Sequence, residues 1–243
     1  MLCGHGLNEL PTTFVFNILC AVSVKVDYII KSKTMKTKIF NFIIIDESGS
    51  MQSIKQEAIN SVNETIQTIR AAEKTHADQE HYVSLVLFNS EVKVVNDCVA
   101  IADVAELTDA TYQPNCCTAL YDAMGLSINA LRKYVTPGDK VLVTIVTDGY
   151  ENASKEWDGK AIKALVEQMR GQGWVFAYIG ANHDVESVAT SISISNSISF
   201  EASPRGVSYM RRRMNSSMDR WFNRISSNES FADSDNCGLF DEF

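Results

Sequence analysis

Residues 39–45, Ile-Phe-Asn-Phe-Ile-Ile-Ile, limit the possible folds of this chain more than any other segment, because nearly all of them are large and apolar. A strand with one face in water alternates apolar and polar residues, whereas a near-continuous apolar run is typical of a strand covered on both faces. Fully buried strands of this kind occur in parallel sheets with helices on either side. The segment therefore predicts an α/β protein.

Further apolar segments alternate between strand-like and helix-like patterns. We expect strands at residues 82–88, 91–99, 140–147, 174–181 and 198–200, and helices at residues 51–74, 119–134, 157–172, 184–191 and 206–225. The second and third strands are joined by the short turn Asn89-Ser90 and should pair as an antiparallel hairpin. This alternation predicts a doubly wound, mostly parallel sheet with helices on both faces and one antiparallel edge strand.

Length and charge narrow the class of protein further. The chain has 243 residues, which is enough for one large α/β domain with extra segments at its ends. Its formal net charge of -8 argues against a general nucleic-acid binder, because such proteins usually present a basic surface. The six cysteines include no C-x-x-C pair, so we expect no zinc site and expect reduced thiols in a cytoplasmic protein.

The two ends of the chain differ in character from its centre. We expect residues 1–34 to be an N-terminal extension outside the fold, residues 35–225 to be the domain, and residues 226–243 to be an acidic, disordered tail. Residues 14–24 are apolar, but the run is too short to span a bilayer and no Lys or Arg precedes it as in a secretory signal. We therefore expect no membrane association, with export as the minor alternative.

Oxygen-bearing side chains stand where the predicted strands and helices meet. Asp46, Ser48 and Ser50 alternate directly after the first strand, Thr118 precedes a helix as its expected N-cap, and Asp148 follows the strand at 140–147. In an open α/β sheet, ligands gather beyond the carboxyl ends of the strands, so these five residues can converge. Carboxylate and hydroxyl oxygens are the ligands that hard cations such as Mg²⁺ prefer.

The D-x-S-x-S loop after a buried strand, the distant Thr118 before Ala-Leu-Tyr-Asp-Ala, and the late Thr-Asp-Gly at 147–149 resemble the von Willebrand factor type A domain. The resemblance covers roughly residues 36–225. It implies a metal-ion-dependent adhesion site made of Asp46, Ser48, Ser50, Thr118 and Asp148, which binds Mg²⁺ or another divalent cation such as Mn²⁺. It also implies that the cation accepts an Asp or Glu carboxylate from a partner protein.

Within that site the resemblance assigns different roles. Ser48 and Ser50 would bind the metal directly, Thr118 directly or through water, and Asp46 and Asp148 directly or through water while balancing its charge. Two positions depart from the family pattern. Glu47 stands where Thr is most familiar, and its charge weakens recruitment of an acidic ligand if it points inward. Cys116-Cys117 stand where Gly is common, which predicts a stiffer loop.

Enzymatic alternatives fit the sequence less well. Ser48 replaces the second Asp of a haloacid-dehalogenase-type phosphatase, and Asp46 and Ser50 replace the glycines of a nucleophile elbow. His183 follows a strand end and is the one weak candidate for a general base in a metal-dependent hydrolase of phosphorylated substrates. We therefore expect an intracellular adaptor or assembly factor that is not an enzyme, with the hydrolase and an exported adhesion protein as alternatives.

Overall fold

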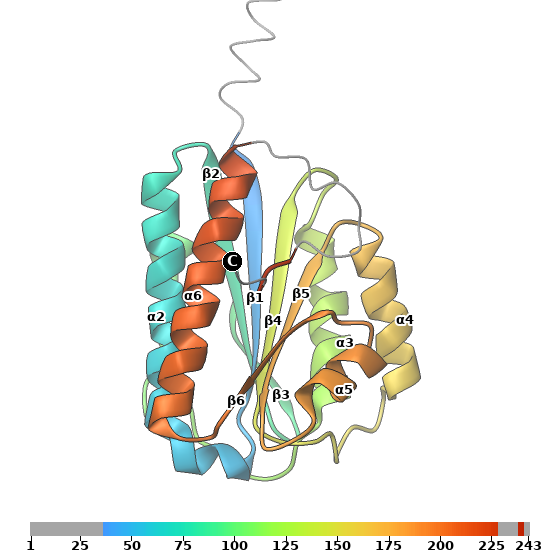
Figure 1. Ribbon diagram of the computed structural model, residues 1–243. Helices are drawn as coiled ribbons and strands as arrows, with labels where there is room; N and C mark the ends of the chain where they lie inside the picture. The colour runs from blue at the N-terminus through green and yellow to red at the C-terminus, as the bar shows by residue number, and fades with distance from the viewer. Residues whose placement is uncertain (1–35, 228–237, 241–243) are drawn as a thin grey trace, which may run out of the picture. The chain divides into compact units, whose positions relative to one another are not determined.

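The computed structural model describes residues 36–227 and 238–240. Six strands form one sheet in the order β3-β2-β1-β4-β5-β6, and every neighbouring pair is parallel except β2 and β3. Helices pack on both faces of this sheet (Figure 1). The doubly wound, mostly parallel sheet with one antiparallel edge strand, expected from the sequence, is confirmed.

The elements lie close to the residues predicted for them. The strands are β1 (Thr37–Asp46), β2 (Gln79–Phe88), β3 (Val92–Ala100), β4 (Lys140–Thr147), β5 (Val175–Ala181) and β6 (Asn196–Phe200). The α-helices are α2 (Lys55–Thr75), α3 (Leu120–Leu131), α4 (Gly159–Arg170), α5 (Val185–Ser191) and α6 (Pro204–Ser226). Short 3₁₀ helices occupy Gly49–Ile54, Ile101–Asp103 and Arg132–Tyr134.

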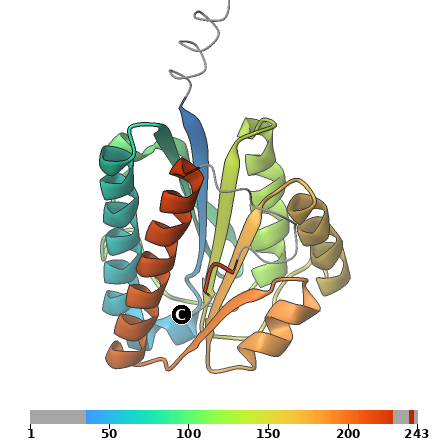
Figure 2. The same ribbon diagram turned by 45° about the horizontal axis from the view of Figure 1, so that its top comes forward.

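The sheet separates two hydrophobic cores. Helices α2 and α6 cover one face, and α3, α4 and α5 cover the other (Figures 1 and 2). Because successive side chains of a strand point to opposite faces, Ile43 and Ile45 of β1 enter the first core while Phe42 and Ile44 enter the second. This explains why residues 39–45 are apolar at almost every position.

Two local expectations differ from the structure. Thr118 is not the N-cap of α3, because Ala119 occupies that position and the cap makes no side-chain hydrogen bond. Thr118 is held instead by Asn152. The Thr118 N–H donates to the side-chain oxygen of Asn152 at 2.9 Å, and the Asn152 N–H donates to the Thr118 carbonyl at 3.0 Å. The helix expected from residue 51 begins as the 3₁₀ helix Gly49–Ile54 and becomes α-helical at Lys55.

The end of the chain contributes to the first core. Leu239 and Phe240 belong to the region expected as a disordered tail, yet both side chains are buried and join the cluster on the α2–α6 face. The predicted extension at residues 1–34 lies outside the described residues, as do 228–237 and 241–243. No helix within the described parts of the chain is long and apolar enough to cross a membrane.

Candidate functional site

The candidate site lies at the carboxyl ends of two neighbouring strands. Asp46 is the last residue of β1, and Asp148 directly follows β4. The two strands are parallel and in register up to Ile45 and Val146, so their ends reach the same edge of the sheet. The topology thus places the two acids next to each other although they are far apart in sequence. Thr147, the residue before Asp148, is already 101 positions from Asp46.

Asp46 is buried and each of its carboxylate oxygens already accepts a hydrogen bond. Oδ1 accepts from the Ser48 N–H at 2.7 Å, and Oδ2 accepts from the Thr147 hydroxyl at 2.6 Å. Burial raises the pKa of Asp46 to about 6, against the lowering effect of these hydrogen bonds, and the nearby charge of Asp148 raises it further. Asp46 therefore fixes the shape of the loop after β1. Burial makes the ionised form of its carboxylate less favourable than it would be in water.

The loop after β1 is joined to Asp148 through its second serine. The Ser50 hydroxyl donates to Oδ1 of Asp148 at 2.5 Å, and the Ser48 and Ser50 hydroxyl oxygens are 3.2 Å apart. The other oxygen of Asp148, Oδ2, is buried and has no hydrogen-bond partner among the described residues. Burial also raises the pKa of Asp148, which Ser50 partly offsets.

The Thr118 hydroxyl lies near the same residues, close to Gly149. A Cβ atom placed on Gly149 would lie 3.7 Å from the Thr118 hydroxyl oxygen and 4.0 Å from that of Ser50. Both hydroxyls therefore lie within ordinary contact distance of the same backbone position. All five residues expected from the sequence thus lie at one edge of the sheet, four linked by hydrogen bonds and Thr118 by proximity.

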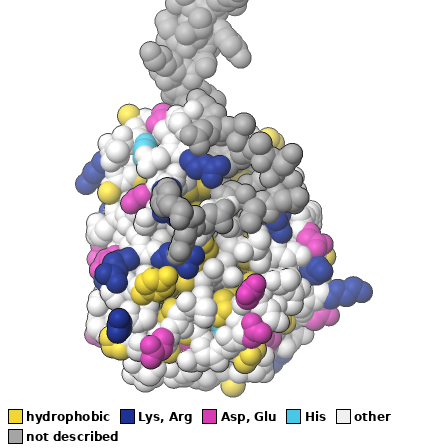
Figure 3. Space-filling view, in the orientation of Figure 1, with side chains coloured by type: hydrophobic (Ala, Val, Ile, Leu, Met, Phe, Trp, Pro, Cys, Tyr) yellow, Lys and Arg dark blue, Asp and Glu magenta, His cyan; other side chains and the backbone are white. Residues whose placement is uncertain are grey.

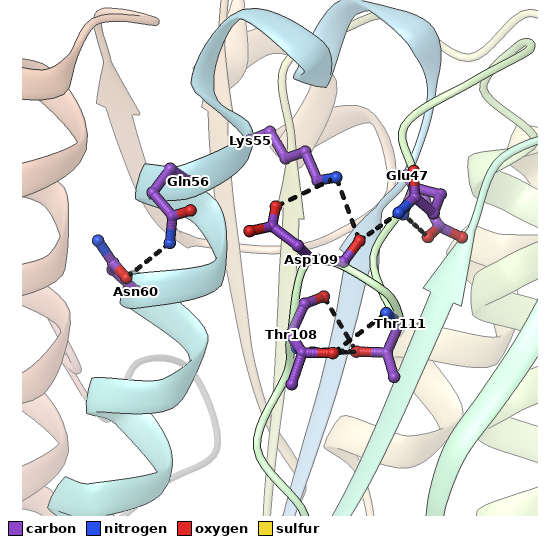
Figure 4. A network of polar contacts seen from close by, with 8 residues as sticks. Glu47, Lys55, Gln56, Asn60, Thr108, Asp109 and Thr111 are labelled. Carbon is purple, nitrogen blue, oxygen red and sulfur yellow. Dashed lines mark hydrogen bonds and ion pairs between the residues drawn. The ribbon is translucent and has the colours of Figure 1, made fainter.

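Glu47 does not point toward the candidate site. Its carboxylate accepts from the Gln113 N–H at 2.5 Å, and its carbonyl accepts from the Asn115 N–H at 2.9 Å. Figure 4 shows Glu47 beside the loop that carries Asp109, whose carboxylate pairs with Lys55 at 3.2 Å. The side chain thus anchors the loop before Thr118, so the concern about an inward-pointing charge does not apply.

The two cysteines before Thr118 differ in backbone conformation. Both are exposed, and Cys116 has a φ angle of 61°, in the left-handed region that Gly adopts without strain. The carbonyl of Cys116 accepts from the Gly49 N–H at 3.1 Å, which ties this loop to the loop after β1. Cys116 therefore adopts a backbone conformation that Gly would adopt without strain.

His183 reaches the edge of the site, but both of its ring nitrogens have partners. Nδ1 is 2.6 Å from the carbonyl oxygen of Ala181, and Nε2 is 3.1 Å from the Tyr178 hydroxyl. Since a carbonyl can only accept, Nδ1 carries the proton and the neutral ring accepts from Tyr178 at Nε2. Burial lowers the pKa of His183, while the Ala181 carbonyl and the charge of Asp148 oppose that effect.

The donor set is suited to a hard cation rather than to zinc. In the described part of the chain, no three or more His, Cys, Asp or Glu side chains are grouped so that they could hold a metal. The candidate site offers two carboxylates and three hydroxyls instead, which is the chemistry that Mg²⁺ and Mn²⁺ accept. The residues present therefore fit such an ion, and the unpartnered Asp148 Oδ2 supplies an acceptor for it.

Comparison with known proteins gives a family model and a set of similar folds. The model described as von Willebrand factor type A domain matches residues 42–209. No curated protein matches the chain. One similar solved structure is the pilus adhesin SpaC from Lactobacillus rhamnosus GG, with a TM-score of 0.56 and 14% identity over 78% of this chain and 30% of that chain.

Two further structures show the same fold. The PilB minor pilin from Streptococcus sanguinis has a TM-score of 0.53 and 11% identity, covering 78% of this chain and 63% of the pilin. Proximal thread matrix protein 1 from the mussel byssus has a TM-score of 0.51 and 16% identity, covering 75% of this chain and 46% of that protein. The chain spans less than two thirds of each of these proteins, and at these identities the likeness concerns the fold alone.

Proposed function

The chain belongs to the von Willebrand factor type A domain family, and we propose that it binds a divalent cation and through it a carboxylate of a partner protein. Domains of this family are generally protein-interaction modules. The finer proposal concerns the cation, which we assign to Mg²⁺ or Mn²⁺ at the edge of the sheet where β1 and β4 end.

The main support for this proposal is the unpartnered carboxylate oxygen of Asp148. Its Oδ2 atom is buried without a hydrogen-bond partner among the described residues, while Oδ1 accepts from Ser50. An unpaired buried carboxylate oxygen is unfavourable, because it has lost its hydration without gaining a donor. A bound cation would remove that penalty, and its positive charge would also favour the ionised form of Asp46, whose pKa burial raises to about 6.

Each residue of the set has a role in this proposal. Ser48 and Ser50 would bind the ion through their hydroxyls, Thr118 would bind it directly or through water, and Asp46 and Asp148 would balance its charge. The cation, when bound, supplies a hard Lewis acid that attracts a further oxygen ligand. Ser50 is exposed whereas Ser48 is buried, so the side of the site near Ser50 is the one open to a partner.

We propose binding rather than catalysis. A metal-dependent hydrolase of phosphorylated substrates would need a general base, and His183 was the candidate that the sequence offered. Its two ring nitrogens are engaged by Ala181 and Tyr178, which leaves no basic nitrogen directed at the site. This geometry supports an adaptor or assembly role.

We also propose that the protein acts in the cytoplasm, on the basis of its cysteine usage and the missing basic flank of the apolar run at residues 14–24. The pilus proteins among the similar structures share the fold at low identity and give no argument for export. Fractionation of cells that express the whole chain would test this proposal, and recovery in the secreted or surface fraction would contradict it.

The interaction itself is tested by affinity capture from lysate with Mg²⁺ or with EDTA. The comparison includes the intact chain, Asp148→Ala and the control Asp103→Ala, which removes an exposed carboxylate from a 3₁₀ helix distant from Asp148 in sequence. We expect one set of proteins to be captured by the intact chain and by Asp103→Ala with Mg²⁺, and to be lost with EDTA and with Asp148→Ala. Capture that survives both changes would contradict metal-dependent recognition.

A further inference from the structure

The segment Gly238–Phe240 packs beside α6 on a surface that includes Asn196 and Arg213, which we call the groove. Leu239 and Phe240 are only 3% and 6% exposed, although this part of the chain is separated from α6 by residues 228–237. Figures 1 and 2 both show this short dark red segment between α6 and the strands β4 and β5. No helix of the described chain covers that part of the sheet, so the segment takes the place of one.

The groove holds the segment by its backbone at two points. The Leu239 N–H donates to Oδ1 of Asn196 at 3.1 Å, and the Phe240 carbonyl accepts from the Arg213 guanidinium at 3.0 Å. Asn196 is itself buried and oriented by its Nδ2 atom, which donates to the Phe176 carbonyl at 3.0 Å. The contacts therefore include one N–H and one C=O, which every peptide offers.

Apolar side chains complete the groove. Leu239 and Phe240 belong to the same hydrophobic cluster as Leu142, Ala177 and Ile198, which come from β4, β5 and β6. In Figure 3 yellow hydrophobic atoms lie next to dark blue Lys and Arg atoms in the middle of this face. The segment is therefore held by apolar side chains together with two backbone contacts, an arrangement that suits two adjacent large apolar residues.

We propose that this groove is a docking site for a partner peptide with two adjacent large apolar residues, and that Leu239-Phe240 occupies it as an intramolecular competitor. The two buried side chains of the segment, Leu239 and Phe240, define the chemistry of that partner. A tethered segment competes at an effective concentration on the order of millimolar when its linker is short. A partner peptide therefore binds measurably only when it is abundant or when the tethered segment is released.

This site is separate from the candidate metal site. Asn196 is the first residue of β6 and pairs with Ala177 of β5, whereas Asp46 and Asp148 lie at the opposite, carboxyl ends of their strands. Peptide docking in the groove consequently needs no cation, and it can succeed or fail whatever happens at the metal site.

The test measures binding of a fluorescent peptide to the full chain. The peptide has the sequence of residues 235–243. In the double variant Leu239→Ala, Phe240→Ala the groove should be open, and the peptide should bind it at least tenfold more tightly than it binds the unmodified chain, in EDTA as well as in Mg²⁺. A peptide with Ala at both apolar positions should not bind. The matched control Leu126→Ala, which trims an apolar side chain that is 41% exposed, should bind the peptide no better than the unmodified chain.

Hydrogen exchange on the unmodified chain tests the same proposal without a variant that could misfold. The Leu239 N–H should exchange at least tenfold faster than amides of β4, and free peptide in excess should accelerate it further. If Leu239 exchanges only with global unfolding, or if a folded double variant binds no peptide, the segment is a fixed part of the core and the proposal fails. A dimer that exchanges tails would also overturn it, because the groove would then serve assembly rather than a partner.

Discussion

The Thr147 hydroxyl donates a hydrogen bond of 2.6 Å to Oδ2 of Asp46 and so joins the end of β4 to the end of β1. Thr147 is fully buried, and its hydroxyl is the only hydrogen-bond donor to that oxygen among the described residues. Asp46 also fixes the loop after β1 through Ser48, so the Thr147 hydroxyl helps to hold the candidate site in place.

Replacing Thr147 with Val keeps the shape of the side chain and removes the donor. We expect the free energy of unfolding to fall by about 1–3 kcal/mol, because a buried carboxylate oxygen loses its partner. Urea unfolding measures the change. The control is Thr144→Val on the same strand, where the side chain lines an apolar pocket and the change should stay within about 0.5 kcal/mol. Equal effects of the two substitutions would contradict the role of Thr147.

The raised pKa of Asp46 predicts an unusual pH dependence of stability in EDTA. Burial raises that pKa from 3.8 to about 6, so between these values the folded chain binds a proton that the unfolded chain has released. Stability contributed by this group is therefore present at low pH and is lost as the pH rises from about 4 to 6, by up to about 3 kcal/mol. Asp46→Asn should remove this part of the slope. Parallel pH profiles for the two proteins would contradict the raised pKa.

The left-handed backbone at Cys116 predicts opposite outcomes for two neighbouring substitutions. Cys116→Gly relieves the strain of a positive φ, about 1–2 kcal/mol, and adds unfolded-state entropy worth about half of that, so stability should stay equal or rise slightly. Cys117→Gly gives no such relief and should destabilise by about 0.5–1 kcal/mol. Thermal unfolding of both variants tests this. A larger loss of stability for Cys116→Gly than for Cys117→Gly would contradict the left-handed backbone at Cys116.

Gly125 in α3 packs against the ring of Trp157. A Cβ atom at this position would lie 2.2 Å from Cδ2 of that ring, so Gly125→Ala should destabilise by about 1–3 kcal/mol, although Ala normally favours a helix. At Gly171, where the nearest atom would be 3.4 Å away, the same change should be neutral or slightly stabilising. Calorimetric melting of both variants compares them, and a stabilised Gly125→Ala would show that Trp157 moves aside freely.

Most of the fold could be predicted because its signals are local. The apolar run at 39–45 identifies a doubly buried strand by itself, and the stripe of α2 identifies its buried face. The five candidate residues could be selected because each stands at the end of a predicted element. Their association also needed the rule that parallel strands end at one edge of the sheet.

The supporting contacts could not be predicted, because they join residues that are distant in sequence. Thr147 and Asn152 carry no pattern that assigns them to Asp46 and Thr118, and Thr118 was wrongly expected to cap α3 for the same reason. The burial of Leu239 and Phe240 was also missed. Their surroundings in sequence are acidic, and their burial depends on a part of the sheet face that none of the described helices covers.

The most direct test of the central claim is isothermal titration calorimetry of the EDTA-stripped chain with Mg²⁺. We expect Mg²⁺ to bind the intact chain, to bind Asp148→Ala about tenfold or more weakly, and to bind the control Asp103→Ala with unchanged affinity. Circular dichroism should show that all three proteins remain folded. Equal Mg²⁺ affinity in the intact chain and in a folded Asp148→Ala, or no binding to any of them, would contradict the account.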